Sequence, residues 1–197
     1  MDDAVYLCEQ LSGRDVEQLK KIELGMPIVA DISRADLLMF CQPRADEAIV
    51  IVHARPRSVT PVYSKLQAGR RVRVVDRPAI IRAFEGRRVT RDDVVQIPEG
   101  APVVQETHPV VGENRRVIGA LCIETNSIEM ERHLRRKKPI RVAVGQLQRM
   151  LLTGQLEASE HLSPFGEHDG ILVVDSQKRI TYISGVGTNL YLSLIHI

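Results

Sequence analysis

Two pairs of short apolar segments, each joined by a turn-forming loop, constrain the fold of this chain more than any other feature of its sequence. The pairs are residues 35–41 and 47–54, around Gln42-Pro43-Arg44-Ala45-Asp46, and residues 103–111 and 116–124, around Gly112-Glu113-Asn114-Arg115. Apolar runs bounded by Gly, Pro, Asn and Asp are typical of β-hairpins. We therefore expect an antiparallel sheet built around two hairpins.

A helix is expected before the first hairpin. Ser12, with Asp15 three residues later, resembles a capping box, and apolar residues follow at helical spacing. This pattern predicts a helix over about residues 14–24. Gly25 and Pro27 interrupt the apolar face beyond it. Because proline removes a helix donor, we expect a kink or a second short helix there.

The segment between the hairpins, residues 55–76, carries many arginines without clear periodicity. It predicts a long loop with one short strand at residues 72–75. Long loops in compact domains are often functional. A short helix over residues 77–84, with Pro78 in its first turn, should follow. Helices that flank hairpins predict an α+β fold with an antiparallel sheet.

Two further helices are expected after the second hairpin. Asn126 can cap the first, and Pro139 opens the second. Apolar and small residues then alternate by four and three positions, at Ile140, Val144, Leu147, Leu151, Gly154 and Ala158. This heptad-like stripe favours a coiled coil between two copies of the chain. A surface helix packed on its own domain explains the same pattern.

The pattern changes after Ser163-Pro164. Residues 170–174 and 179–184 flank a polar turn and predict another hairpin. The remaining residues are too few to bury a core of their own, so we interpret them as the start of a second domain. The closing residues 192–197 resemble translated sequencing adapter, which indicates a truncated gene model.

The composition restricts the classes of function. Hydrophobic residues make up 44% of the 197 residues and charged residues 26%, as in folded domains rather than disordered chains. A formal net charge of +2 and an aromatic content of 4% argue against nucleic-acid binding. The longest aliphatic run, residues 48–52, is too short to span a bilayer, and the acidic start is unlike a signal peptide. We therefore expect a cytoplasmic protein without a membrane segment.

The cysteines are widely spaced and form no Cys-x-x-Cys pair: Cys8, Cys41 and Cys122. An odd number of cysteines in a cytoplasmic chain indicates reduced thiols rather than a disulfide framework. The histidines have no metal-ligand spacing with these cysteines. We therefore expect neither a metal nor a haem site.

Several short motifs occur in a specific order: Ala54-Arg55-Pro56; Arg77-Pro78-Ala79-Ile80 with Ala83-Phe84 and Gly86; Glu106-Thr107-His108-Pro109-Val110; Arg116-Val117-Ile118-Gly119; and Glu124-Thr125-Asn126. Together they resemble the amino-terminal GAF-type sensor domain of a class of soluble bacterial sensor histidine kinases, over about residues 11–156. Residues 169–175, followed by Arg179-Ile180-Thr181-Tyr182, are similar to the opening hairpin of a PAS domain.

The resemblance implies a GAF-type sensor domain at residues 1–138, a connecting signalling helix at 139–162 and the start of a truncated PAS domain at 163–197. It implies a regulatory sensory input module of a two-component histidine kinase. Such a module binds a signal and passes a conformational change to a kinase core, which this chain lacks. His133 is a superficial match to a phosphoacceptor histidine, but no Asn follows it closely, so we interpret it as a solvated helix residue.

The resemblance also implies the partners. These are a second copy of the chain, a small-molecule signal, and a response regulator that is reached through the absent kinase core. ATP would serve that core, and no cofactor is expected in this chain. The full-length parent would be a histidine protein kinase, a phosphotransferase, and a nucleotide cyclase is an alternative output domain. We expect no catalytic residue here.

A small GAF-type redox enzyme, such as a methionine sulfoxide reductase, is the alternative function. Cys41 and Cys122 would then be its redox-active residues. This chemistry needs an accessible thiolate of low pKa and a resolving partner. The sequence indicates neither.

GAF-type folds commonly have a cavity between one sheet face and the crossover segment, which here is the arginine-rich stretch from Arg55 to Arg77. Strand alternation predicts two faces for the second strand, Ile49, Ile51 and His53 on one and Val50, Val52 and Ala54 on the other. The side on which His53 lies therefore decides whether it can reach the crossover.

The candidate ligand-binding residues are His53, Arg55, Arg77 and His108. If His53 faces the crossover, these side chains could offer hydrogen-bond donors to an anionic or carbonyl-bearing ligand. In the alternative interpretation, Arg55 and Arg77 pair with Glu106 or Glu124 and fasten the loop to the sheet.

Overall fold

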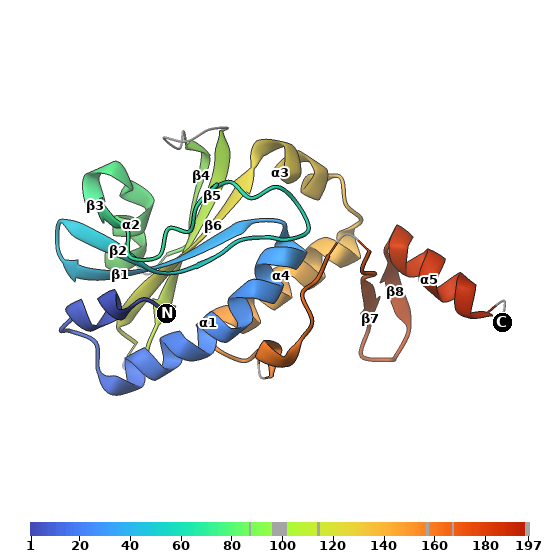
Figure 1. The fold of residues 1–197 in the computed structure, drawn as a ribbon, viewed down its shortest axis with the longest axis horizontal. Coiled ribbons are helices and arrows are strands. Elements are labelled where there is room, and N and C mark those ends of the chain that lie inside the picture. Colours follow the sequence, from blue (N-terminus) through green and yellow to red (C-terminus); the bar gives the residue numbers. More distant parts are fainter. Residues whose placement is uncertain (87, 96–101, 114, 157, 167, 196–197) are drawn as a thin grey trace.

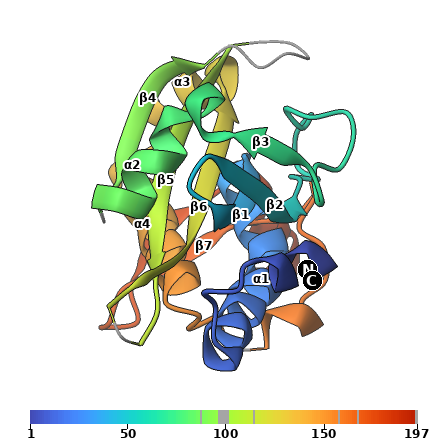
Figure 2. The same cartoon turned by 90° about the vertical axis from the view of Figure 1, so that its left-hand side faces the viewer.

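An antiparallel sheet of six strands forms the centre of the molecule, in the order β3-β2-β1-β6-β5-β4. The computed structural model describes residues 1–86, 88–95, 102–113, 115–156, 158–166 and 168–195. The strands are β1 (Asp36–Arg44), β2 (Glu47–Ala54), β3 (Arg71–Arg73), β4 (Thr90–Val95), β5 (Val103–Val111) and β6 (Val117–Asn126). Figure 2 shows β3 and β4 at opposite edges of the sheet. Both predicted hairpins and the α+β fold are confirmed.

Helices cover both faces of this sheet. The helices are α1 (Gly13–Ser33), α2 (Pro78–Gly86), α3 (Ser127–Leu134) and α4 (Lys138–Leu152), with short 3-10 segments η1 (Asp3–Leu7), η2 (Val74–Asp76) and η3 (Ser159–His161). α1 and α4 lie side by side and share one apolar core with the sheet (Figure 1). α2 packs in a second core on the other face. Within the described residues, no helix is both long and apolar enough to cross a membrane.

α1 is one helix of 21 residues that includes Pro27, so of the two predicted outcomes a second short helix is wrong. Its predicted capping box is present, because the Ser12 hydroxyl accepts from the Asp15 N–H and the Asp15 carboxylate accepts from the Ser12 N–H, at 3.2 and 2.9 Å. The helix continues because side chains on both sides of Pro27 are buried, and their burial outweighs one missing backbone hydrogen bond. These fully buried side chains are Ile22, Met26, Val29 and Ala30.

The apolar stripe of α4 packs against the same chain. Ile140, Val144 and Leu151 are 2%, 3% and 0% exposed. The helix ends at Leu152, before Gly154, whose φ of 67° lies in the left-handed region. The interpretation as a helix packed on its own domain is therefore confirmed, and this stripe leaves no free seam for a coiled coil.

The segment between β2 and β5 follows its prediction in part. The expected short strand is present as β3, and the expected helix at residues 77–84 is α2. β4 is an additional strand that pairs with β5 and that the sequence did not predict. Its start, Thr90-Arg91-Asp92-Asp93, is polar, so it lacks the apolar pattern that indicates a strand.

A small unit follows α4 and η3. β7 (Leu172–Val174) and β8 (Ile180–Ile183) form the predicted third hairpin, and α5 (Gly185–Ile195) follows it. Figure 1 shows this unit at one end of the molecule, beyond α4. The domain boundaries after residues 138 and 162 stay predictions.

β2 contains a bulge that changes which side chains share a face. Met39 pairs with Val52, but Phe40 pairs with Val50, so Ile51 is the extra residue on β2. After the bulge, Val52 and Ala54 pack with Ile49 and Ile51 in the α1 core, and the predicted separation of these residues is wrong. His53 consequently lies on the opposite face, toward the crossover loop.

Cys8 and Cys41 form a disulfide, so the prediction of three reduced thiols is wrong for this pair. Cys8 follows η1, which packs against β2, while Cys41 lies on β1 beside that strand. The two cysteines are 33 residues apart, and only the fold brings them together. Cys122 is free and buried.

Candidate functional site

Three polar side chains on the central strands are buried beneath the crossover loop, which we define as residues 55–70. They are Asp36 at the start of β1, His53 near the end of β2, and Glu124 near the end of β6. Asp36 and Glu124 are cross-strand partners, and both are 0% exposed. Two buried carboxylates at one pair position are tolerated only if each has its own partners.

The first carboxylate is satisfied by the histidine and the loop. Asp36 Oδ1 lies 3.0 Å from His53 Nε2, and Asp36 Oδ2 accepts from the Val62 N–H at 2.7 Å. The Gln67 N–H donates to His53 Nδ1 at 3.1 Å. Because Nδ1 accepts, the neutral imidazole carries its proton on Nε2 and donates it to Asp36. Nδ1 therefore holds the loop at Gln67, while Nε2 joins β2 to Asp36 on β1, whose other carboxylate oxygen holds the loop at Val62.

The second carboxylate belongs to a buried triad of Tyr63, Arg77 and Glu124. The Tyr63 hydroxyl donates to Glu124 Oε2 and accepts from Arg77 Nη2, both at 2.7 Å. Arg77 Nη1 also forms an ion pair with Glu124 Oε1. Burial and the charge of Glu124 raise the pKa of Tyr63, so the phenol stays protonated. Burial opposes the charge of Arg77, but Glu124 outweighs it and raises the arginine pKa.

These contacts decide between the two interpretations of the arginines. The predicted alternative, in which Arg77 pairs with Glu124 and fastens the loop, is confirmed. Arg55 Nη1 instead donates to the Ser64 carbonyl at 2.9 Å, so it ties the loop to itself rather than to either glutamate.

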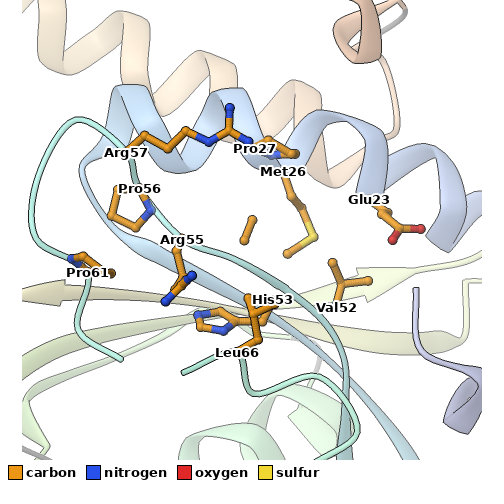
Figure 3. A pocket seen from close by; sticks show the side chains of 11 residues that line it. Glu23, Met26, Pro27, Val52, His53, Arg55, Pro56, Arg57, Pro61 and Leu66 are labelled. Carbon is orange, nitrogen blue, oxygen red and sulfur yellow. The ribbon is translucent and has the colours of Figure 1, made fainter. Parts of the chain in front are cut away.

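A pocket of about 460 Å³ lies between α1, the end of β2 and the crossover loop (Figure 3). We call it the α1 pocket. Its lining residues are Glu23, Met26, Pro27, Val52, His53, Ala54, Arg55, Pro56, Arg57, Pro61 and Leu66. Most of this lining is apolar, and the loop contributes two arginines. Pockets of this size commonly hold small molecules.

The four predicted ligand-binding residues do not form one site. His53 and Arg55 line the α1 pocket, but the His53 side chain is 0% exposed, with both ring nitrogens in use. Arg77 lies in the buried triad. His108 is on the face of β5 toward α4, where its Nε2 lies 2.8 Å from Glu106 Oε1.

Two residues at or beside the α1 pocket, Arg57 and Asp31, were not among the candidate site residues predicted from the sequence. Arg57 is exposed at the pocket, and within the described part of the chain its guanidinium has no hydrogen bond or ion pair. Asp31, on α1, is 2% exposed and accepts from the Arg57 N–H at 2.6 Å and from the Phe165 N–H at 3.3 Å. Burial raises the Asp31 pKa, against these two hydrogen bonds and the positive charge of Arg57. Asp31 thus joins the pocket loop to the segment that precedes the third hairpin.

The state of the cysteines does not favour the redox alternative considered above. Cys41 is buried in the disulfide. Cys122 is 0% exposed, and burial raises the pKa of its thiol to about 12. A reactive cysteine needs an accessible thiolate. Among the described residues, no group of three or more His, Cys, Asp and Glu side chains is placed to hold a metal ion.

Comparison with known proteins agrees with this architecture. The structure is similar to one described as the sensor region of a sensor histidine kinase, with a TM-score of 0.68 and 22% sequence identity, over 98% of this chain and 68% of that chain. It overlaps more weakly with the C-terminal domain of the E. coli transcriptional regulator KdgR, with a TM-score of 0.47 and 12% identity, over 71% of this chain and 98% of that domain. An overlap of that size supports no conclusion about function. No curated protein matches the sequence.

The family assignment comes from the sequence itself. The family described as "Histidine kinase PdtaS, GAF domain" matches residues 1–141, which include the whole six-stranded sheet, α1, α2 and α3, and only the start of α4. The likeness to a sensor region agrees with that assignment at the level of the fold. The chain therefore belongs to the family of histidine kinase PdtaS GAF domains, and it is a regulatory sensory input module.

Proposed function

We propose that the signal sensed by this module is a small anionic molecule with an apolar part, bound in the α1 pocket. The observation that supports this proposal is the pocket itself, with apolar side chains from α1 and β2 and two arginines on the loop side, while Glu23, the one carboxylate in its lining, is paired with the amino terminus of Met1. Apolar walls with a few placed polar groups are typical of small-molecule sites. The guanidinium of Arg57 can pair with a carboxylate or phosphate at the pocket mouth.

A ligand in this pocket would contact both α1 and the crossover loop. Asp31 accepts hydrogen bonds from the loop and from the segment after η3, so a shift of the loop changes a contact that leads to the third hairpin. A ligand shifts such an equilibrium only if it binds the two arrangements unequally. The two hydrogen bonds of Asp31 would connect a change in the loop to a change before the third hairpin.

The wider context is part of the same proposal. β7, β8 and α5 would begin a PAS domain, followed by a histidine kinase core that uses ATP and a response regulator as its partner. The module would work in the cytoplasm as a homodimer. Because the α4 stripe is buried in the single chain, dimer contacts would use another surface. Light scattering on the purified chain tests the dimer directly.

A thermal-shift screen with small carboxylates and phosphates tests the site. Three variants are compared with the parent chain: Arg57→Gln, Arg55→Ala, and Arg14→Gln as a control of equal charge change. Arg14 is exposed and pairs with the exposed Glu113, and neither residue lines the α1 pocket. A ligand at one hundred times its Kd stabilises the folded state by about 2.7 kcal/mol, which such a screen detects.

The expected result separates binding from structure. Arg57→Gln should lose the ligand shift and lower the melting temperature of the free protein only slightly, because the charge of Arg57 favours the buried Asp31 carboxylate, while Arg14→Gln keeps both. Arg55→Ala should lower the melting temperature without ligand, because it releases the Ser64 carbonyl. A ligand shift that is equal in the parent and in Arg57→Gln would refute the proposed site.

A further inference from the structure

A second pocket, of about 340 Å³, lies between the end of α1 and the third hairpin. We call it the junction pocket. Its lining comes from α1, the crossover loop, the connection between α3 and α4, the start of α4, and the unit that contains β7, β8 and α5. Figure 1 shows that unit beyond α4, and α4 contacts both of its strands. The junction pocket shares no lining residue with the α1 pocket.

Arg136 brings an unsatisfied buried donor to this pocket. It lies in the connection between α3 and α4 and lines the junction pocket. Its Nη1 atom is buried, and no described residue accepts a hydrogen bond from it. The guanidinium also forms no ion pair within the described parts of the chain. A buried charged donor without a partner costs free energy, so this position favours a ligand with an acceptor oxygen.

The charges around Arg136 do not supply that partner. Burial lowers the pKa of Arg136, the charge of Arg34 lowers it further, and the charge of Glu129 opposes them without compensating. Glu129 is already shared, because it lies 3.4 Å from Arg34 Nη1 and forms an ion pair with Arg132. One carboxylate thus serves three guanidinium groups at this place.

Two carboxylates in the lining restrict the kind of ligand. Asp31 is 2% exposed, and both of its oxygens already accept backbone N–H groups. Asp169 is exposed, and among the described residues only its Oδ2 is in use, accepting from the Gly166 N–H at 2.6 Å. Asp169 therefore keeps a free carboxylate oxygen. A simple anion would meet this carboxylate, and a simple cation would meet Arg34 and Arg136.

Apolar side chains supply another part of the lining. Ile32, Phe165, Ile171 and Val186 are half-buried, so part of each side chain stays open to a ligand. One comes from α1 and three from the segments around the third hairpin. The volume lies at the lower end of the range of about 300–1,000 Å³ found for most ligand pockets, so the ligand must be small.

We propose that the junction pocket binds a free α-amino acid with an aliphatic side chain. At neutral pH such a molecule carries both a carboxylate and an ammonium group. The carboxylate would satisfy Arg136 Nη1, the ammonium group would pair with Asp169, and the side chain would lie against the half-buried apolar residues. A ligand with a single charge satisfies only one of these two groups. This site lies beyond the proposed function, because it uses other residues and does not depend on a ligand in the α1 pocket.

Isothermal titration calorimetry with L-leucine at pH 7 tests the proposal. Two analogues each lack one of the charges: 4-methylpentanoate has no ammonium group, and leucinamide has no carboxylate. The parent chain should bind leucine at least about tenfold more tightly than either analogue, because each analogue loses one hydrogen bond between charged groups.

Two variants assign the contacts, and a third is the control. Arg136→Gln should weaken leucine binding about tenfold and leucinamide binding less. Asp169→Asn keeps an oxygen for the Gly166 N–H, and it should remove the preference for leucine over 4-methylpentanoate. The control is Arg135→Gln, because the Arg135 side chain is 77% exposed, pairs with Glu131 and does not line the pocket. This control should bind leucine as the parent does.

Circular dichroism checks that all three variants are folded. No heat of binding with leucine, or equal affinity of the parent chain for leucine and both analogues, would overturn the proposal. So would equal weakening in Arg136→Gln and Arg135→Gln, or an unchanged preference for leucine in Asp169→Asn.

Discussion

Replacement of Arg77 by methionine tests whether the buried triad holds the crossover loop. The substitution keeps a long apolar stem and removes the guanidinium. Glu124 is 0% exposed, and after the change it would keep only the Tyr63 hydroxyl as a side-chain partner. The cross-strand partner of Glu124 is Asp36, another buried carboxylate, so a Glu124 charge without Arg77 would face a like charge.

The expected cost is large because the unpaired charge stays buried. Removal of one partner of a buried ion pair costs about 3–5 kcal/mol in the free energy of unfolding. The Arg77 side chain is 12% exposed, so solvent screens this pair only weakly. For comparison, Arg71→Met breaks an ion pair with Glu47 in which the side chains are 57% and 23% exposed, and it should cost less than about 1 kcal/mol.

Urea unfolding followed by far-ultraviolet circular dichroism measures both variants. A second substitution, Glu124→Gln, completes a double-mutant cycle. Glutamine removes the buried charge and keeps an acceptor for Tyr63, so the double variant should be more stable than the sum of the single effects by about 1–3 kcal/mol. Equal costs for Arg77→Met and Arg71→Met, or strict additivity in the cycle, would refute the reasoning.

Three other predictions concern the rest of the domain. Leu151→Ala should cost about 2–5 kcal/mol by urea unfolding, because the side chain is 0% exposed, and it should leave the mass from light scattering unchanged. Ellman's reagent should detect one thiol, Cys122, in the unfolded and unreduced chain, and three after reduction; the native chain should react slowly because burial raises the pKa of that thiol to about 12. His108 holds the pKa of Glu106 below its usual range, so this contribution to stability is present above the ordinary glutamate pKa and is lost as the pH falls through the lowered value; His108→Gln should flatten the acid side of the stability profile.

Local patterns predicted most of the fold. Short stretches of sequence were enough to predict both hairpins, the helix caps at Ser12 and Asn126, and the start of α2 at Pro78. The structure contains each of these features. The errors arise where packing outweighs local preference. α1 continues through Pro27 because burial on both sides holds it.

The site could be predicted only in part, because its contacts join distant segments. Tyr63 and Glu124 are 61 residues apart, and no local pattern indicates that pair. Arg77 was recognised both as a candidate ligand residue and as a partner of Glu124, and sequence alone could not choose between the two roles. The bulge at Ile51 moved His53 to the other face of β2, which simple alternation cannot anticipate.

The two sets of contacts that hold the crossover loop differ in strength, and this difference determines how a signal can travel. The contacts to Asp36 and Glu124 are buried and include an ion pair whose loss costs about 3–5 kcal/mol. A small ligand in the α1 pocket, bound as proposed, supplies only its differential affinity for two loop arrangements, commonly about 1–3 kcal/mol. Such a ligand cannot break the buried network, but it can shift the Asp31 contact to Phe165, which is a longer hydrogen bond of 3.3 Å. A signal is therefore expected to pass along α1 through Asp31 toward the third hairpin, while the sheet beneath the loop stays intact.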